Sequence, residues 1–531
     1  MKNVVWLIAV SILCACGSDS GSDKADVPAE IAIDAAAEVI QDVALAEVIE
    51  ETVAEVAEDV LVPPFPFGFE SRGWTLLRGI VHLHSALSHD GCGPDGYEDY
   101  GGPDPDCISE LRAAPCISGI DFMFMTDHPG EAKYHTFEEG LQYRAAEGDE
   151  IIYDEQDRPY ANRITCPEGS LVESSLFYVG TEGTKHMPIG MAGPVPMEVY
   201  ETPYSDDIPL EQAQAAVAIV HSLGGWVYAP HTEEPNIPVE RIVELPLDGM
   251  EIYNVHTNLM QGLDDLENIF AIDKFMAEGP DPDLALLPFF AAVDKDVTKF
   301  DQAAAQIRIA HIAATDIHRN VEIPALCPGG IEGSMCEAFV DDYPNFANFM
   351  QTGGPFPLSD GDRMDSYERS FRWFSNYAVT ASGDPADIRE AIGMGRSYSA
   401  FDMFGQASGF DFFVVGDGEA IEMGTELAGV GEALAYIRTP TLENPPWRTA
   451  ELFHFKGKVT TKLVRATLAG SEVLLEEEGQ GLLLEVPLPG PGAYRVEISI
   501  VPYHLKEILI GVEQFASKEY PYIYSNAIFL R

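Results

Sequence analysis

One recurring pattern constrains the fold more than any other feature: an apolar, β-rich run that ends in His, Asp or Glu. The clearest runs are residues 76–81, 120–125, 176–180, 226–230, 249–254 and 309–315. Helical stretches follow at 210–223, at 263–277, and from Asp384 and Pro385 to Gly393. Strands that alternate with helices predict a parallel α/β sheet. Polar residues gathered at the carboxyl ends of such strands favour a barrel.

The residues at these strand ends are of the types that bind metal ions. His82 and His84 alternate along an extended chain, so both imidazoles can reach one ion. The other candidate ligands are His89, Asp90, His128, Glu182, His186, His231, Asp316 and His318. Neutral imidazole suits Zn, Mn or Fe, and carboxylates can bridge two ions. Adjacent ions can generate a bound hydroxide and polarise a scissile bond, so the pattern predicts a hydrolytic metal centre.

This set of motifs resembles the polymerase and histidinol phosphatase (PHP) superfamily of metal-dependent phosphoesterases. The matching pieces are residues 82–84, 88–91, 126–128, 180–186, 230–231 and 315–318, and the resemblance covers roughly residues 74–400. It implies an α/β fold, a distorted seven-stranded β/α barrel that holds two or three divalent metal ions.

The resemblance also implies a ligand set for each ion. The first ion would be held by His82, His84, Glu182 and Asp316. Glu182 would bridge to a second ion, which His186 and His231 also hold. His128 and His318 would hold a third ion. His89 and Asp90 stand together after Ser88, so either one could complete that third site.

Four residues are candidates for catalysis. Glu182 and Asp316 lie at the centre of the implied ligand set. Arg319 follows the Asp316–His318 motif and could grip a phosphate oxygen or form a structural salt bridge. His256 could contact the substrate or act as an acid. Asp127 is expected to orient a neighbouring imidazole rather than bind an ion.

The two ends of the chain differ from its middle. Residues 1–15 resemble a bacterial lipoprotein signal, which implies cleavage before Cys16 and a lipid on its thiol; a plain cleaved signal is the alternative. Residues 16–64 are an acidic, Ala/Glu/Val-rich stretch that predicts a solvated tether. The barrel is expected over 65–405, followed by a small antiparallel β-sandwich over 406–531. Residues 522–528 resemble the ending of exported superfamily members, some of them grouped with carbaryl-type hydrolases.

Six of the eight cysteines lie beyond the signal, and in an exported protein this number suggests disulfides. Cys107 and Cys116 are close enough for a local loop, as are Cys327 and Cys336, which would leave Cys92 with Cys166. The sequence alone allows 15 pairings. A zinc–thiolate site is the alternative, but no CxxC spacing supports it.

The formal net charge of −56 disfavours nucleic acid and anionic lipid surfaces as partners.

From the lipoprotein-like signal we expect an exported bacterial lipoprotein, held at the periplasmic face or in the outer membrane by a lipid on Cys16. Its expected activity is hydrolysis of a small phosphomonoester or phosphodiester. A carbamate, amide or ester hydrolase on the same site is the first alternative, and a non-catalytic, metal-stabilised binding lipoprotein is the second. The oligomeric state stays open.

Overall fold

The computed structural model describes most of the chain beyond residue 64. The described residues are 65–92, 103–132, 134–183, 186–193, 196, 209–233, 237–262, 266–323, 325–332, 334–429, 431–448 and 457–531. The predicted signal and tether, together with Cys16, lie outside them.

All six predicted strands are present. They are β1 (Thr75–Leu83), β2 (Phe122–Met125), β5 (Ser174–Val179), β7 (Trp226–Ala229), β8 (Gly249–Asn254) and β9 (Ala310–Ala314). The set β1–β2–β5 is parallel, and so is the set β7–β8–β9. Strands β2, β8 and β9 are buried along their whole length, which explains their continuous apolar runs. The α/β prediction is confirmed, with the predicted strands in two parallel sets that lie within mixed sheets.

The two parallel sets belong to different sheets, but their ends meet. Strands β7–β9 lie in a four-stranded sheet with β6 (Met187–Ile189), while β1, β2 and β5 lie in a 13-stranded mixed sheet. The amide of His84 donates to the carbonyl of Ile317 at 3.0 Å, and the amide of Thr181 donates to Pro188 at 2.9 Å. The first bond joins the carboxyl ends of β1 and β9, and the second joins the carboxyl end of β5 to β6.

The strands after residue 405 pair almost entirely antiparallel, as predicted. They are β14 (Gln406–Ser408), β15 (Asp411–Gly416), β16 (Glu419–Ile421), β17 (Glu426–Leu427), β18 (Ala433–Arg438), β19 (Thr441–Glu443), β20 (Lys458–Thr467), β21 (Gly470–Glu478), β22 (Leu483–Pro487), β23 (Gly492–Val501), β24 (Tyr520–Ser525) and β25 (Ile528–Leu530). Strand β24 pairs with β13 (Ser397–Ala400), so this region extends the large sheet that contains β1. Strands β16, β15, β18 and β22 form a second sheet. The boundary at residue 405 stays a prediction.

The remaining strands belong to the large sheet, except for β10 and β11, which pair with each other. They are β3 (Glu150–Tyr153), β4 (Pro159–Thr165), β10 (Glu322–Ile323), β11 (Gly354–Pro355) and β12 (Ser375–Thr380). Strand β12 joins β1 to β13 and thereby connects the two halves of the large sheet.

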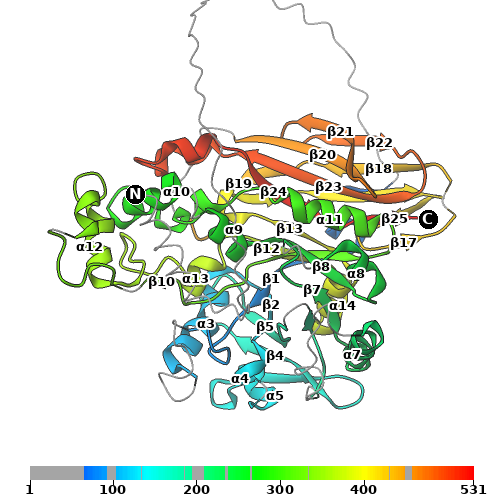
Figure 1. Cartoon of the computed structure of the whole chain (residues 1–531). Coiled ribbons are helices and arrows are strands. Elements are labelled where there is room, and N and C mark those ends of the chain that lie inside the picture. The colour runs from blue at the N-terminus through cyan, green and yellow to red at the C-terminus, as the bar shows by residue number, and fades with distance from the viewer. Residues whose placement is uncertain are drawn as a thin grey trace, which may run out of the picture.

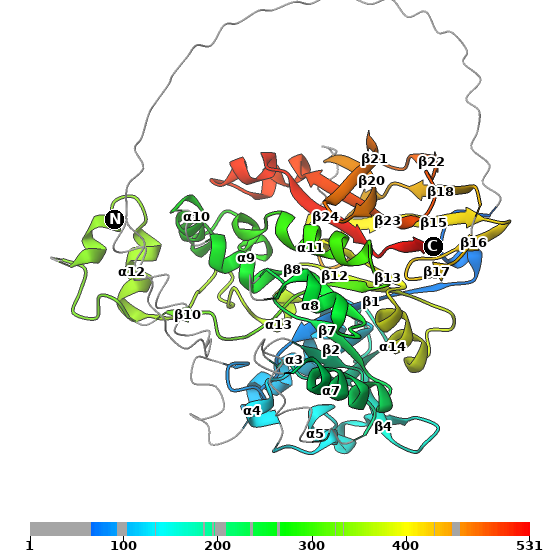
Figure 2. The same ribbon diagram turned by 45° about the vertical axis from the view of Figure 1, so that its right-hand side comes forward.

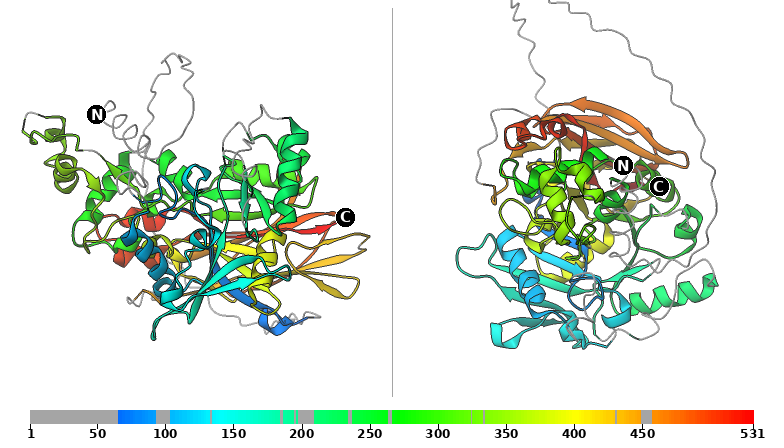
Figure 3. Two further views of the ribbon diagram at one scale, coloured as in Figure 1. Left: turned by 90° about the horizontal axis from the view of Figure 1, so that it is seen from below. Right: turned by 60° about the vertical axis from the view of Figure 1, so that its left-hand side comes forward.

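The helices lie mainly between the strands of the first 400 residues. They are α3 (Pro105–Ser118), α4 (Pro129–Ala132), α5 (Phe137–Gly140), α7 (Leu210–Ser222), α8 (Val239–Glu244), α9 (Val255–Gly262), α10 (Leu266–Met276), α11 (Asp294–Ala304), α12 (Pro344–Thr352), α13 (Tyr367–Ser370) and α14 (Pro385–Met394). Figure 1 shows α8, α9 and α11 between the C-terminal strands and the rest of the chain. The segment around α12 projects from one side of the molecule (Figures 1 and 3).

Helix α14 corrects one predicted boundary. The helix runs past Gly393 and ends at Gly395, which adopts a left-handed φ of 69°. A side chain at Gly393 would place its Cβ about 2.0 Å from the ring of Trp226. Gly393 is therefore required by close packing, and Gly395 is the residue that ends the helix.

One hydrophobic core joins the C-terminal strands to the helices below them (Figure 2). It includes Phe300 of α11, Leu463 of β20 and Ile498 of β23. Beside it, the buried guanidinium of Arg495 on β23 pairs with Asp301 of α11 at 2.8 Å. The C-terminal region is therefore packed firmly against the part of the chain that carries the candidate ligands.

Three disulfides link the six described cysteines: Cys92–Cys107, Cys116–Cys166 and Cys327–Cys336. The expected local loop between Cys327 and Cys336 is confirmed. The pairings of Cys107 with Cys116 and of Cys92 with Cys166 were wrong. Cys107 and Cys116 lie on the same helix, α3, and each bonds to a cysteine outside that helix.

The disulfides suggest an extracellular or periplasmic environment. Within the described residues, every helix is too short or too polar to cross a bilayer.

Candidate metal centre

The predicted ligands gather into two neighbouring groups at the carboxyl ends of the strands. Cluster A consists of His82, Glu182, His231 and Asp316, and cluster B consists of His84, Asp90, His128 and His318. Within each cluster, one ligand atom from every residue lies within 4.8 Å of the others. The eight side chains come from five separate segments of the chain, so the fold has assembled them from distant positions.

The spacing inside cluster A fits a transition-metal ion. The Nε2 atom of His82 lies 3.1 Å from Glu182 Oε2 and 3.2 Å from Asp316 Oδ1. The Nε2 atom of His231 lies 2.7 Å from Glu182 Oε1. Ligand atoms about 2.0–2.1 Å from a tetrahedral centre lie about 3.3 Å apart. Two imidazoles and two carboxylates at this spacing match such a centre in both geometry and chemistry.

Cluster B is built around Asp90. Its Oδ2 atom lies 3.3 Å from the Nε2 atoms of both His128 and His318. Its other oxygen, Oδ1, accepts a hydrogen bond from Ser88 at 2.7 Å. Ser88 therefore orients the carboxylate toward the two imidazoles.

The two clusters touch each other. The Nε2 atom of His84 lies 3.3 Å from that of His82 and 3.2 Å from Glu182 Oε2. The ring of His84 also stacks on His318, with centroids 4.0 Å apart. His84 is thus a member of cluster B that also borders cluster A. The family resemblance had implied that His84 shares an ion with His82, Glu182 and Asp316 and that His231 holds a second ion, so the observed grouping differs from the implied one. Ions in the two clusters would be close neighbours.

The backbone at three of the cluster A residues is strained. His82, His231 and Asp316 have φ values of 64°, 48° and 45°, in the left-handed region. His82 also lies at a register shift between β1 and β2. Such conformations cost free energy and persist where surrounding structure enforces them, often at functional sites. The strain at all three strand ends supports a functional role for cluster A.

Burial and charge act together on the titrating groups. Burial alone would raise the pKa of Glu182, but His82 and His231 hold that pKa well below its usual range. Burial alone would lower the pKa of His128, yet hydrogen bonding and attraction to Asp90 raise it to about 10. The carboxylates therefore stay ionised, and the site attracts protons or metal cations.

Two predicted ligands fall outside both clusters. His186 is buried, but its ring packs over Gly183, where an added Cβ would lie 2.5 Å from the imidazole. The amide of Gly183 donates to the carbonyl of His186 at 2.9 Å, so the chain folds back on itself there. The side chain of His89 is 44% exposed. Of the two adjacent candidates for the third ion, the structure brings Asp90 into a cluster.

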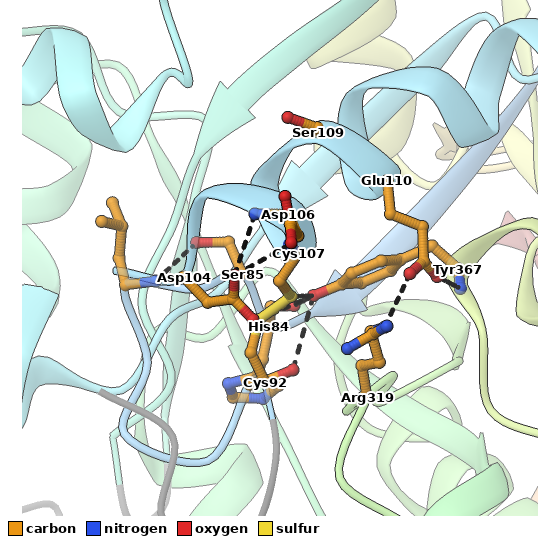
Figure 4. Close-up of a disulfide and its surroundings, with 12 residues drawn as sticks. His84, Ser85, Cys92, Asp104, Asp106, Cys107, Ser109, Glu110, Arg319 and Tyr367 are labelled. Atoms are coloured by element: carbon orange, nitrogen blue, oxygen red, sulfur yellow. Dashed lines mark hydrogen bonds and ion pairs between the residues drawn. A yellow bond between two sulfur atoms is a disulfide. The ribbon is translucent and has the colours of Figure 1, made fainter. Parts of the chain in front are cut away.

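The remaining predicted residues have identifiable contacts. The Nδ1 atom of His256 lies 3.4 Å from Asp316 Oδ2, which places His256 at the edge of cluster A. Arg319 forms a salt bridge with Glu110 of α3 at 2.6 Å (Figure 4) and belongs to neither cluster. Asp127 accepts hydrogen bonds from the amide and hydroxyl of Ser85 at 2.6 and 2.8 Å. Asp127 therefore holds the turn after His84. The prediction was that it would orient a neighbouring imidazole, whereas these hydrogen bonds go to Ser85.

A disulfide and a tyrosine support the loop that carries cluster B. Figure 4 shows the Cys92–Cys107 bond next to Tyr367, whose hydroxyl donates to the carbonyl of His84 at 2.6 Å. The amide of Tyr367 donates to Glu110, the partner of Arg319, at 2.9 Å. Helix α3, the loop after β1 and the start of α13 are thereby tied together beside the ligands.

Sequence reasoning gave no role to Glu251, the charged residue inside the apolar run of β8. Glu251 is 1% exposed, and its Oε1 atom lies 2.5 Å from His82 Nδ1. Its Oε2 atom accepts a hydrogen bond from the backbone amide of His231 at 2.8 Å. A charged residue in the middle of a buried strand requires a partner. The position of Glu251 within an apolar run was therefore the sequence signal that could have revealed its role. Glu251 fixes two cluster A residues at once.

The variant Glu251→Gln should lower metal affinity by about 10- to 100-fold, because a carboxylate behind a ligating imidazole fixes its orientation and raises its basicity. Competition titration with a metal-binding dye would measure the change. Glu240→Gln, at an exposed position on α8, is the matched control and should have no effect. Equal affinity in Glu251→Gln and the wild type would show that Glu251 does not support the site.

Comparisons with known proteins find only distant likenesses. No family model matches the chain, and no curated protein matches it. One likeness is to a solved two-domain protein from Bacteroides vulgatus, described as containing a predicted PHP-like metal-dependent phosphoesterase. It is 12% identical with a TM-score of 0.28, and the match covers 86% of this chain and 96% of that protein. PsfC from Pseudomonas syringae is 16% identical with a TM-score of 0.23, covering 36% of this chain and 70% of its own. Likenesses this distant assign no activity to the chain. An activity is therefore inferred from the side chains of clusters A and B.

Proposed function

We propose that this protein is a metal-dependent hydrolase of phosphomonoesters or phosphodiesters. The observation that carries the proposal is the pair of touching clusters, with five imidazoles and three carboxylates at ligand spacing. Divalent ions bound there would activate water and neutralise negative charge on a phosphoryl group. A purely structural metal site rarely needs two adjoining sets of this kind.

Different residues of the chain would hold the ions and transfer the proton. The His82 and His231 imidazoles and the Glu182 and Asp316 carboxylates would hold one ion, and the residues of cluster B a second. Glu182 lies against both clusters, 3.1 Å from His82 and 3.2 Å from His84. It is therefore the residue best placed to bridge two ions. His256, beside Asp316 and 27% exposed, is placed to pass a proton to a leaving group.

Two further features of the proposal concern architecture and location. Strands β1, β2, β5, β6, β7, β8 and β9 would form the distorted seven-stranded barrel, and the hydrogen bonds at Thr181 and His84 that join the two sheets support that closure. The disulfides fit an exported protein. A lipid on Cys16 would anchor it to a membrane through the acidic stretch beyond that cysteine.

Hydrolysis of a carbamate or carboxylic ester is the second candidate, and one observation favours it. Arg319, the cation next to the Asp316–His318 motif, is held by Glu110 rather than left to grip a phosphate. A less charged substrate would not need such a group.

A substrate panel distinguishes the candidates. The full chain, loaded separately with Zn, Mn and Fe, would be assayed with an aryl phosphomonoester, a bis-aryl phosphodiester, an aryl carbamate and an aryl carboxylate ester. We expect turnover of a phosphoester that stops when metal is removed. Turnover of the carbamate or ester alone would favour the second candidate, and turnover of none would favour a non-catalytic role.

In the same assay Arg319→Ala adds a second criterion. If Arg319 leaves Glu110 to contact a phosphate, the variant should raise KM for phosphoesters with a smaller effect on kcat. An unchanged KM would show that the ion pair is purely structural.

A further inference from the structure

A pocket opens beside the metal clusters, and its walls are apolar. The space between its walls, open mouth included, is about 400 Å³. The apolar walls are formed by Val255, Leu259, Leu286, Ile317, Val321 and Trp373. Five of them, all but Val321, are at most 6% exposed.

The pocket reaches both clusters. Asp316 of cluster A and His318 of cluster B line it, and so does His256. A molecule whose reacting bond lies at the metal clusters could therefore place an adjoining group in this pocket.

Two polar side chains in the pocket lack partners. Within the described part of the chain, neither the amide nitrogen nor the amide oxygen of Asn320 has a hydrogen-bond partner, and Asn320 is 1% exposed. The hydroxyl of Ser370, fully buried, also lacks one among these residues. Both residues line the pocket. Buried polar groups are normally satisfied, and an unsatisfied one costs free energy. A bound ligand that donates to and accepts from Asn320 would remove that cost.

The charges around the pocket limit the charge of a ligand that could bind in it. Asp316 and Asp365 line it, and none of the described lining residues is Lys or Arg. The Asp365 carboxylate is already engaged, with Arg363 and with the amide of Val321 at 2.7 Å. An anionic group in the pocket would face the Asp316 carboxylate, with no Lys or Arg among the described lining residues to pair with it.

The geometry points to a substrate class: esters whose organic group is uncharged and apolar and carries one hydrogen-bonding substituent that contacts Asn320 and Ser370. This inference rests on the proposed hydrolytic function, since it names what the same site would accept. Asn320 is thereby a specificity-determining residue. A site with unpaired polar groups also discriminates against analogues that cannot satisfy them.

The test uses three small uncharged molecules and the metal-loaded full chain. Benzamide has both an aromatic ring and an amide, acetamide has only the amide, and toluene has only the ring. Binding is followed by ligand-detected NMR, which does not depend on turnover. We expect benzamide to bind at least about tenfold more tightly than either of the others, since each of them loses one type of contact. Equal binding of all three, or none, would overturn the inference.

The variants locate the binding. Asn320→Leu, similar in size, should weaken benzamide binding about tenfold or more, and Ser370→Ala should weaken it less. Asn348→Leu, at an exposed position on α12, is the matched control and should change nothing. Thermal unfolding of each variant checks that the fold persists; if Asn320→Leu fails to fold, Ser370→Ala decides the matter. Benzamide binding that is unchanged in the folded pocket variants would contradict the assignment.

Inhibition kinetics separate this inference from the proposed function. Benzamide should inhibit phosphoester hydrolysis competitively, and Asn320→Leu should relieve that inhibition. If the protein hydrolyses phosphoesters but benzamide neither binds nor inhibits, the pocket assignment fails and the function stands. If benzamide binds in an Asn320-dependent way and no ester is hydrolysed, the pocket assignment stands as a ligand site and the hydrolase proposal fails.

Discussion

Asp316→Ala should reduce metal-dependent hydrolysis by about a thousandfold or more, because each ~1.36 kcal/mol of lost transition-state stabilisation is a tenfold loss in rate. The Asp316 carboxylate lies 3.2 Å from His82, 3.4 Å from His84 and 3.4 Å from His256. Removing it takes a ligand from cluster A and a neighbouring carboxylate from three imidazoles. His82→Ala should have an effect of similar size, since His82 contacts both carboxylates of the cluster.

The measurement is kcat/KM on the preferred substrate, with bound metal quantified in each variant. Asp341→Ala, at an exposed position, is the matched control and should retain full activity. Asp316→Ala and His82→Ala that fold, lose metal and still turn over substrate at the wild-type rate would refute a catalytic role for cluster A.

Removal of metal should abolish activity and also destabilise the fold. The ions would bind the native chain alone, so at a free concentration a thousandfold above Kd each would contribute about 4 kcal/mol to the free energy of unfolding. Dialysis against a chelator should therefore lower the unfolding temperature, and adding back Zn, Mn or Fe should restore it. The same treatment should have a smaller effect on Asp316→Ala, which has already lost its cluster A ion but keeps all four residues of cluster B.

Metal binding should also depend on pH with a definite sign. Without an ion, His128 keeps its proton up to a pKa of about 10, because Asp90 stabilises the charged form. An incoming ion must displace that proton, so affinity should fall as the pH is lowered and protons should be released on binding. Calorimetry in two buffers of different ionisation enthalpy measures the release. A pH-independent affinity with no proton release would contradict this role of cluster B.

The strands and most of the residues of the two clusters were predictable because their signals are local. A buried parallel strand reads as a continuous apolar run, and a histidine or aspartate directly after it must lie at the carboxyl edge. His82, His84, His128, Glu182, His231, Asp316 and His318 were all found in this way, and the two clusters contain all of them.

The features that the sequence did not reveal depend on how separate parts of the chain approach one another in the fold. The ring of His186 turns over Gly183, which the spacing from Glu182 does not reveal. Cys107 and Cys116 are near in sequence, but each bonds to a cysteine outside their shared helix, at Cys92 and Cys166. Glu251 lies within a strand rather than at its end, so the rule that found the ligands passed over it. The pocket was also invisible, because its walls come from α9, the 3-10 segment near Leu286 and the chain around Trp373.

Anomalous X-ray diffraction on crystals of the metal-loaded protein, collected above and below the absorption edge of the added metal, tests the central claim most directly. The proposed metal centre predicts one peak bounded by His82, Glu182, His231 and Asp316, and a second bounded by His84, Asp90, His128 and His318. A map without a peak in either cluster, from protein loaded with Zn, Mn or Fe, would contradict it.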